Sequence, residues 1–263
     1  FKFMITKEKF VNTYKYKNFG LKQYDYLEKK EILPIVASPI LANIIGHLTG
    51  DGSLSGNFYN GAIRFYGTKE KLKGIEYDML KLFNKKSTHF KEKVKNSFEL
   101  RYNDALFHRL FFLLEVPKGD KPITEFGVPK WIMQGNKEIK RAYLQAICDD
   151  ELSTPRKIPN KINSWDNLKL KFSKSENLLD CGTRFLTQIK NMFEEFNISS
   201  GNVGITGRYE RKDGVITRGI YINLSVKIKN RINFYKEINF KRESKKRSLM
   251  YESVKYHVET FIN

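Results

Sequence analysis

The chain has 263 residues, and its 48 Lys and Arg residues against 29 Asp and Glu residues give a formal net charge of +19. Hydrophobic residues make up 40% of the chain and aromatic residues 14%, which excludes a disordered basic tail and fits one large or two small folded domains. The positive charge favours a polyanionic partner, with nucleic acid as the first choice and an anionic membrane surface as the second.

The sequence has no signal for a membrane protein or a secreted one. No apolar run approaches the roughly 20 residues that span a bilayer, and the N-terminus carries charges where a signal peptide needs its apolar stretch. Cys148 and Cys181 are the only cysteines, too few for a disulfide framework or a four-ligand zinc site. We therefore expect a soluble intracellular protein, in the cytoplasm or nucleoid or in an organelle matrix.

Residues 1–36 are rich in Lys and Tyr and show no clean hydrophobic period. They predict a basic N-terminal arm, either a solvated helical arm or linker, or a small accessory pair of DNA-binding helices. Phe1 stands where an initiator Met would begin a complete chain, so we expect this end to be trimmed or incomplete.

A buried helix is predicted directly after this arm. Ser38 and Pro39 are typical of a helix start, and the run from Ile40 to Leu48 is apolar on nearly all sides, so it must be buried on nearly all sides. His47 in this run is expected to be a packed core residue. The elements expected next are a strand at 58–66, a helix at 71–83, paired strands at 88–94 and 97–102, and a helix at 106–114.

The second half repeats this order after a loop rich in Pro and Gly at 116–122. The elements expected there are a helix at 140–148, a strand at 168–172, an amphipathic helix at 178–196, a hairpin of 203–209 and 217–226, and a helix at 227–238. A basic helical tail at 241–247 is expected to be a solvated face or to brace a phosphate backbone. We divide the chain into the arm (1–36), a first repeat (37–120), a linker (121–136) and a second repeat (137–263).

The two halves align residue by residue at their buried helices. Ile44 to Gly52 (IIGHLTGDG) lies 100 positions before Leu144 to Leu152 (LQAICDDEL), with small residues at the third position and acids at the eighth. Residues 65–72 (FYGTKEKL) likewise parallel residues 171–178 (KFSKSENL). A repeat of this kind predicts a pseudo-two-fold molecule.

The repeat predicts a metal centre. Small residues let the two apolar helices pack together at the pseudo-dyad, which would place the acids at their ends, Asp51 and Glu151, side by side. Two carboxylates in contact are costly unless a cation lies between them. Mg²⁺ is the natural cation, because it takes oxygen ligands and is usually held by one or two carboxylates.

These motifs resemble the paired motifs of the LAGLIDADG homing endonucleases in their single-chain, two-motif form. The segments 114–122 and 128–132 are similar to the stretch that precedes the second motif in that family, and 171–178 resembles its strand-to-helix corner. The resemblance runs from about Ser38 to Leu249. It implies an α+β fold of duplicated αββαββα units, with two antiparallel saddle-shaped sheets over the DNA and helices on the outer face.

The resemblance also implies a monomeric, Mg²⁺- or Mn²⁺-dependent endonuclease that cuts double-stranded DNA at a long asymmetric site; Ca²⁺ is expected to bind without supporting cleavage. Asp51 and Glu151 match the catalytic, metal-binding acids, and the carbonyls of Gly50 and Asp150 are possible further ligands. Lys174 matches a basic catalytic position, whose counterpart in the first half is Thr68. In the mechanism so implied, the metal activates a water for attack on phosphorus and Lys174 stabilises the developing charge.

The chain departs from the family pattern at three positions. Thr49 replaces an acid that has a structural capping role. Asp150 stands where a small residue is usual, so we expect it to push the helix ends apart or to compete with Glu151 for the metal. Leu152 replaces a glycine and is expected to deny the chain an easy turn at positive φ.

Alternation along the strands predicts a DNA-binding face, with Arg suited to guanine and Lys to phosphate. The residues expected on it are Asn57, Tyr59, Arg64, Lys91, Lys93 and Lys95 in the first half, and Lys157, Lys161, Lys169, Lys171, Arg208, Arg211 and Arg218 in the second. The main alternative is a non-cleaving binder of the same fold, such as an RNA-splicing maturase, for which intron RNA is a partner, or a transcription regulator. A generic basic scaffold would leave the repeat unexplained. An intein is not expected, since Phe1 is no splicing nucleophile and Asn263 follows no His.

Overall fold

The computed structural model describes residues 4–161 and 164–258. The described chain is an α+β protein with two antiparallel sheets, one of strand order β1-β2-β4-β3 and one of order β5-β7-β6. Helices α4 and α5 pack on the first sheet and α8 packs on the second. The predicted α+β class and the duplicated arrangement are confirmed. No helix in the described part of the chain is long and apolar enough to cross a bilayer.

The first half has the predicted order αββαββα. Its elements are α3 (Pro39–Thr49), β1 (Ser53–Ser55), β2 (Ala62–Gly67), α4 (Lys69–Phe83), β3 (His89–Val94), β4 (Ser97–Asn103) and α5 (Ala105–Leu113). Side chains at the helix starts accept hydrogen bonds from the first free amides: Ser38 caps α3, Thr68 caps α4 and Asp104 caps α5. The predicted strand at 58–66 begins later than expected, because residues 58–60 form a turn.

The second half keeps the same order but reduces its first strand. Its elements are α7 (Lys137–Glu151), β5 (Lys169–Ser175), α8 (Leu179–Glu194), β6 (Gly204–Glu210), β7 (Ile216–Asn223), α9 (Ile228–Asn233) and α10 (Ser244–Val258), with short helices α6 (Lys130–Met133), η1 (Lys121–Ile123), η2 (Glu176–Leu178) and η3 (Phe234–Ile238). A single bridge between Leu152 and Leu170 replaces the three-residue pairing of β1 with β2 in the first half.

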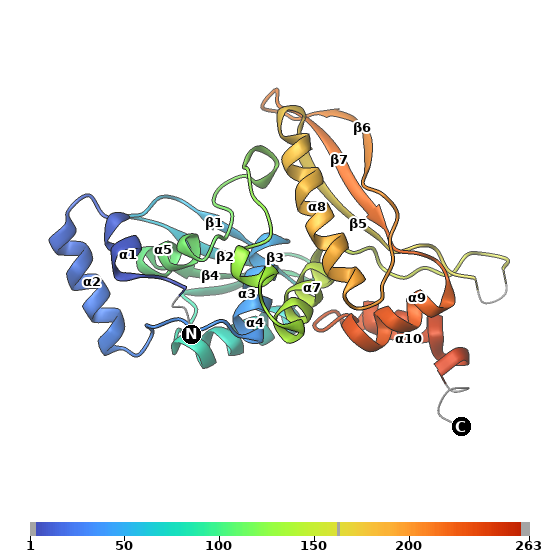
Figure 1. The fold of residues 1–263 in the computed structure, drawn as a ribbon, viewed down its shortest axis with the longest axis horizontal. Coiled ribbons are helices and arrows are strands. Elements are labelled where there is room, and N and C mark those ends of the chain that lie inside the picture. Colours follow the sequence, from blue (N-terminus) through green and yellow to red (C-terminus); the bar gives the residue numbers. More distant parts are fainter. Residues whose placement is uncertain (1–3, 162–163, 259–263) are drawn as a thin grey trace.

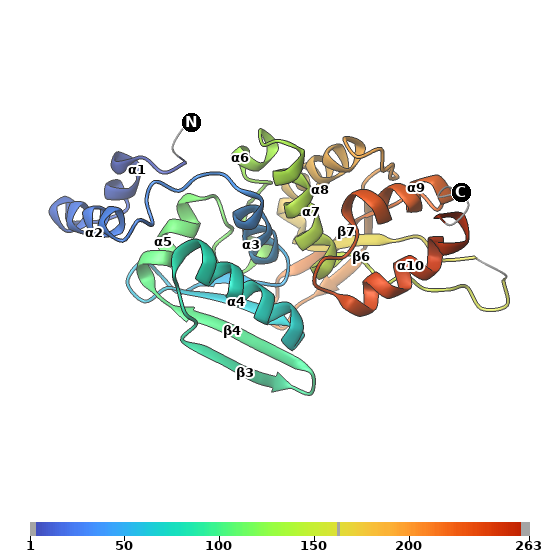
Figure 2. The same ribbon diagram turned by 90° about the horizontal axis from the view of Figure 1, so that it is seen from below.

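Helices α3 and α7 pack against each other at the centre of the molecule, between the two halves (Figures 1 and 2). Gly46 lies at the point of closest approach, since a Cβ added there would lie 2.6 Å from Cβ of Ala146 and 2.8 Å from the carbonyl of Tyr143. The predicted contact between the small residues of the two motifs is therefore confirmed. His47 is 1% exposed, as expected of a core histidine.

The N-terminal segment is not a solvated arm. It forms two helices, α1 (Lys7–Asn12) and α2 (Lys17–Lys29), which lie at one end of the molecule beside α5 (Figures 1 and 2). Phe10 and Leu27 are fully buried, and the guanidinium of Arg109 on α5 donates to the carbonyl of Thr13. Buried apolar side chains spaced along both helices explain why the segment folds onto the first half.

The basic tail is solvated in part, with Lys241, Lys245 and Arg247 exposed, and is otherwise folded back onto the helices. The backbone amides of Lys241 and Arg242 each donate to the carboxylate of Asp149 at 2.9 Å. The guanidinium of Arg242 donates to Asn43 at 3.0 Å and to Asp78. This segment therefore ties α3, α4 and α7 together, because the guanidinium of Arg242 binds Asn43 and Asp78 while its backbone amide binds Asp149.

Candidate functional site

The two predicted acids lie at the adjacent ends of the paired helices. Asp51 follows α3 with its side chain 43% exposed, and Glu151 is the last residue of α7. Burial, followed by the charge of Asp150, raises the pKa of Asp51. Burial, followed by the charges of Asp51 and Asp150, raises the pKa of Glu151 to about 8. The structure thus brings Asp51 and Glu151 within range of each other's charge.

Asp150 does not compete for the open side of this site. Its carboxylate is fully buried and accepts from Nδ1 of His47 at 3.0 Å, from Nζ of Lys71 at 2.7 Å and from the backbone amide of Asp51 at 3.0 Å. Gly50 makes the room, since a Cβ there would lie 2.5 Å from Oδ2 of Asp150. The expectation that Asp150 pushes the helix ends apart is wrong, because its side chain fills the space that the glycine of the other half leaves.

Lys71 supplies the charge that holds this network. Burial opposes the ionisation of Asp150, but its contacts with His47 and Lys71 outweigh burial and lower its pKa. Burial lowers the pKa of His47, against the charge of Asp150, whereas the charges of Asp150 and Asp51 outweigh burial at Lys71 and raise its pKa. Lys71 also donates to Oδ2 of Asp51 at 3.1 Å. The first half therefore has a basic side chain at its acid, three residues after the predicted counterpart Thr68.

Leu152 needs no positive φ. It adopts φ −79° and ψ 134°, an extended conformation, and its side chain is buried. Its counterpart Gly52 is required by packing instead, because a Cβ there would lie 2.8 Å from the carbonyl of His47 and 2.9 Å from that of Arg64. The expected backbone problem at Leu152 is therefore absent.

Two lysines that the sequence did not single out reach the helix ends. Nζ of Lys121, after α5, donates to the carbonyls of Gly50 and Gly52. Nζ of Lys246, on α10, donates to the carbonyls of Asp149 and Leu152 at 2.8 and 2.7 Å. Lys121 follows α5, the last helix packed on the first sheet, and Lys246 lies on α10, near the end of the second half. A comparison of the ends of the two halves is the signal that would have found them. Their charges lower the pKa of Glu151, against the larger effects of burial and the acids.

Lys174 lies away from the two acids. Its side chain is buried at the end of β5, and its Nζ donates to the carbonyls of Lys121 and Thr124 and lies 3.9 Å from the ring centroid of Phe126. Burial lowers its pKa to about 8. These hydrogen bonds hold Lys174 against the segment that carries Lys121.

The donor set fits a divalent cation only in part. No group of three or more His, Cys, Asp or Glu side chains suited to a metal occurs among the described residues, and the carbonyl of Gly50 accepts from Lys121. Two carboxylates, Asp51 and Glu151, remain on the open side. This is the number that Mg²⁺ commonly takes from a protein when phosphate and water complete its shell.

The polar face of the first sheet carries part of the predicted interface. Arg64 pairs with Arg101, and Lys91 pairs with Glu99, so they lie opposite the buried Ile63 face. Nζ of Lys93 lies 2.6 Å from Glu99 on the same face. The remaining predicted residues of this half, Asn57, Tyr59 and Lys95, lie in turns beside the sheet.

The second sheet divides its predicted residues between two faces. Lys169 and Lys171 pair with Asn223 and Tyr221 on the face opposite the buried Phe172. Arg208 and Arg218 pair with each other, with Arg218 opposite Lys174, and both contact Glu176 on the other face. The expectation that these two arginines share a face with the lysines is wrong, because side chains alternate along a strand.

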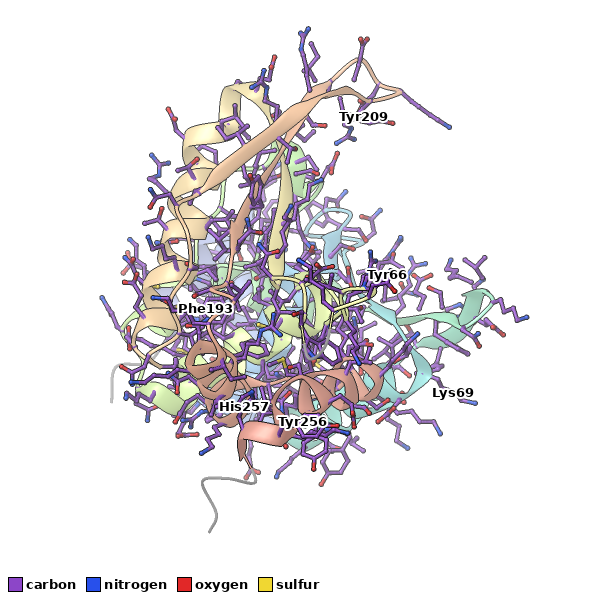
Figure 3. All side chains as sticks on the ribbon, turned by 90° about the vertical axis from the view of Figure 1, so that its right-hand side faces the viewer. Tyr66, Lys69, Phe193, Tyr209, Tyr256 and His257 are labelled. Carbon is purple, nitrogen blue, oxygen red and sulfur yellow. The ribbon has the colours of Figure 1, made fainter. Side chains whose placement is uncertain are left out.

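The other predicted residues of this half lie outside the sheet. Arg211 pairs with Asp120 and Asp213, whereas Lys157 and Lys161 lie in the long loop that follows Leu152. Figure 3 shows Tyr209 near the end of the β6–β7 hairpin, which projects far from the helical body, and Tyr66 on β2. Hairpin and loop thus extend the basic surface well beyond the helix ends.

The raised pKa of Glu151 predicts a gain in stability when its charge is removed. In the unfolded chain this carboxyl ionises near its ordinary pKa of 4.5, and in the folded chain near 8. The folded state therefore binds more protons between these values, and its stability falls as pH rises. We expect the free energy of unfolding of Glu151→Gln to exceed that of wild type by about 4 kcal/mol at pH 8 and to equal it at pH 4. Urea unfolding at both pH values measures this, and an equal gain at both would contradict it.

The chain is similar to known proteins over only a part of their length. No family model matches the chain. The chain is 32% identical over 263 residues to DNA-directed RNA polymerase subunit Rpo1N of Methanocaldococcus jannaschii, covering 92% of this chain and 19% of that protein. It is 28% identical to the replication factor C small subunit of the same organism (71% and 10%) and 26% identical to tRNA-splicing ligase RtcB of Pyrococcus abyssi (79% and 22%). The chain spans less than a quarter of the length of each of these relatives.

The structure is also similar to solved structures. One is full-length DUF199/WhiA from Thermatoga maritima, with a TM-score of 0.44 and 15% identity, over 90% of this chain and 71% of the WhiA chain. They also include the I-SmaMI LAGLIDADG homing endonuclease bound to cleaved DNA, with TM-score 0.43, 9% identity, and coverage of 86% and 92%.

Proposed function

We propose that the chain is a metal-dependent endonuclease of the LAGLIDADG homing type, which hydrolyses both strands of a long asymmetric DNA target. The observation that carries this proposal is the pseudo-symmetric pair of helix ends. Each end presents one acid, Asp51 or Glu151, and each has a lysine ammonium on its last carbonyls. A double-strand cut requires two hydrolysis reactions, one on each strand. Two acids and two lysine ammonium groups at one point can supply one acid and one cation to each reaction.

The residues of this chain have separable roles in the proposed reaction. Arg64, Lys91, Lys169 and Lys171 bind the phosphates of the duplex on the polar faces of the sheets. Lys121 and Lys246 place positive charge beside the acids, where it stabilises the negative charge that develops on the phosphate. Asp51 and Glu151 would hold Mg²⁺ or Mn²⁺, which when bound supplies Lewis-acid stabilisation of the attacking and leaving oxygens. One chain provides both acids, so we propose that it acts as a monomer.

The similarity to a polymerase subunit, a replication factor and an RNA ligase supports a module that is separate from those activities. The three relatives have different names, but each shares a segment of 196 to 263 residues with this chain. Because proteins with such different names share this segment, it does not carry the activity that is particular to any one of them. We therefore propose no polymerase or ligase activity for this chain.

A non-cleaving nucleic-acid binder of the same fold is the second candidate, such as a maturase acting on intron RNA or a transcription regulator. It is favoured by Lys71, which already neutralises Asp51 and Asp150. It is also favoured by the lack of a three-ligand cluster in the described chain.

A binding and cleavage selection distinguishes the two candidates. Duplexes that bind the protein from a randomised DNA library in Ca²⁺ are recovered and then incubated with Mg²⁺, Mn²⁺ or EDTA. We expect cleavage of both strands in Mg²⁺ and Mn²⁺, and intact bound duplex in Ca²⁺ or EDTA. Tight sequence-specific binding without cleavage under any condition would establish the non-cleaving binder instead.

A further inference from the structure

A cavity of about 380 Å³ lies between the N-terminal helices and the first half, away from the acids. Its lining is unusually aromatic and includes Tyr14, Tyr16, Phe19, Phe58 and Tyr59. Tyr16 is 70% exposed, Phe19 53% and Tyr59 78%. Three exposed aromatic side chains around one cavity are informative, because large apolar rings gathered at a surface mark a binding site more often than scattered ones do.

Arg109 lies at the base of this cavity and is only 2% exposed. Its guanidinium stacks between two rings, 3.7 Å from the centroid of Tyr14 and 4.4 Å from that of Phe58. Its terminal nitrogens donate to the carbonyls of Thr13 and Phe58. Its Nε has no hydrogen-bond partner within the described part of the chain. A buried N–H without an acceptor is costly, and Arg109 belongs to the lining of the cavity.

The cavity therefore offers flat apolar walls and the donor groups of Arg109, with Lys15, Gln23 and Asp104 as the other polar residues of its lining. A nucleobase has the matching chemistry, because it combines an aromatic ring for stacking with ring and carbonyl acceptors for an N–H. Lys15 and the +19 charge of the chain favour a base that is linked to phosphate. A base paired in a duplex cannot present its face to this cavity, so the strand must be unpaired there.

We propose that this cavity, lined by Tyr16, Phe19, Tyr59 and Arg109, binds an unpaired nucleobase of a single-stranded nucleic acid. The site extends the proposed DNA-binding function to a strand outside the two sheets. It involves neither the acids nor the metal, so it stands or fails independently of cleavage.

The test is binding of a fluorescently labelled single-stranded DNA, measured by anisotropy at low and at raised salt. We expect Tyr59→Ala and Tyr16→Ala each to weaken binding about five- to hundredfold, by the same factor at both salt concentrations because stacking is not a counterion effect. Tyr59→Phe should bind like wild type, since it keeps the ring. Tyr77→Ala is the matched control, an exposed tyrosine on α4 that is 64% exposed and outside this cavity.

Two further ligands identify what the cavity recognises. A strand of the same length without bases should bind wild type and Tyr59→Ala equally, because the contact that the variant removes is made to a base. Adenosine monophosphate should bind far more weakly than the strand. The proposal is overturned if Tyr59→Ala and Tyr16→Ala bind the strand as Tyr77→Ala does, if the abasic strand shows the same loss, or if the free nucleotide binds as tightly as the strand.

Discussion

Asp51→Asn and Glu151→Gln are each expected to lower the rate of DNA cleavage by at least about a hundredfold, with binding of the duplex in Ca²⁺ or EDTA largely retained. Each substitution keeps the size of its side chain and removes the negative charge that a divalent cation requires. Because the two acids come from different halves, the single variants report whether each half supplies one cleavage. Strand-specific labels on the two DNA ends measure the two cuts separately.

The control for these variants is Glu194→Gln, an exposed acid at the end of α8, which should cleave at the wild-type rate. A variant at Asp51 or Glu151 that still cuts both strands normally would contradict the assignment of the catalytic acids. Loss of duplex binding together with cleavage would show that the substitution disturbed the fold instead. Circular dichroism and the urea unfolding described above for Glu151→Gln separate these outcomes.

Asp150→Ala is expected to lower the free energy of unfolding by about 3–5 kcal/mol, because it leaves a buried charge without its main partner. Lys71 is 2% exposed, and Asp150 is its nearer carboxylate at 2.7 Å. The same substitution also removes the acceptors of His47 and of the amide of Asp51. Urea unfolding at pH 7 measures the loss.

The matched control is Asp25→Ala, which breaks an ion pair of the same type, between Asp25 and Lys7, whose side chains are 54% and 50% exposed. Such a surface pair contributes about 1 kcal/mol or less. Because the pKa of Asp150 is lowered on folding, its contribution is present above the ordinary carboxyl pKa of 3.8 and is lost as pH falls below it. A similar loss in both variants, or a loss that persists at acidic pH, would contradict the role of burial.

The elements of the fold follow local signals, which explains why most of them could be predicted. Ser38 with Pro39, Thr68 and Asp104 each mark a helix start by satisfying amides that no residue within the helix can satisfy. The apolar run of α3 requires burial on nearly all sides, and the repeated small residue at Gly46 and Ala146 allows α3 and α7 to meet. The structure of the 1–36 segment was harder to predict, because its buried residues are few and irregularly spaced among lysines.

The chemistry of the candidate site depends on contacts between residues that are far apart in the sequence. Lys121 is 69 positions from Gly52 and Lys246 is 94 positions from Leu152 in the sequence. The hydrophobic periods of helices and strands do not predict contacts over such separations. The burial of Asp150 depends on Gly50, 100 positions earlier, whose missing Cβ leaves the space. The pairing of β5 with β7 places Arg218 opposite Lys174 and so on the other face from Lys169 and Lys171. A register shift between Ile205 and Arg208 then places Arg208 opposite Arg218.

The amino-acid sequence alone was enough to establish a basic, duplicated α+β protein with an acid at the end of each central helix, because charge, hydrophobic period and helix capping are properties of neighbouring residues. The partners of those acids emerged only from the folded chain. Lys71, Lys121 and Lys246 are three lysines among many, and a lysine acquires its role from the burial and the carboxylates or carbonyls that the fold places around its ammonium group.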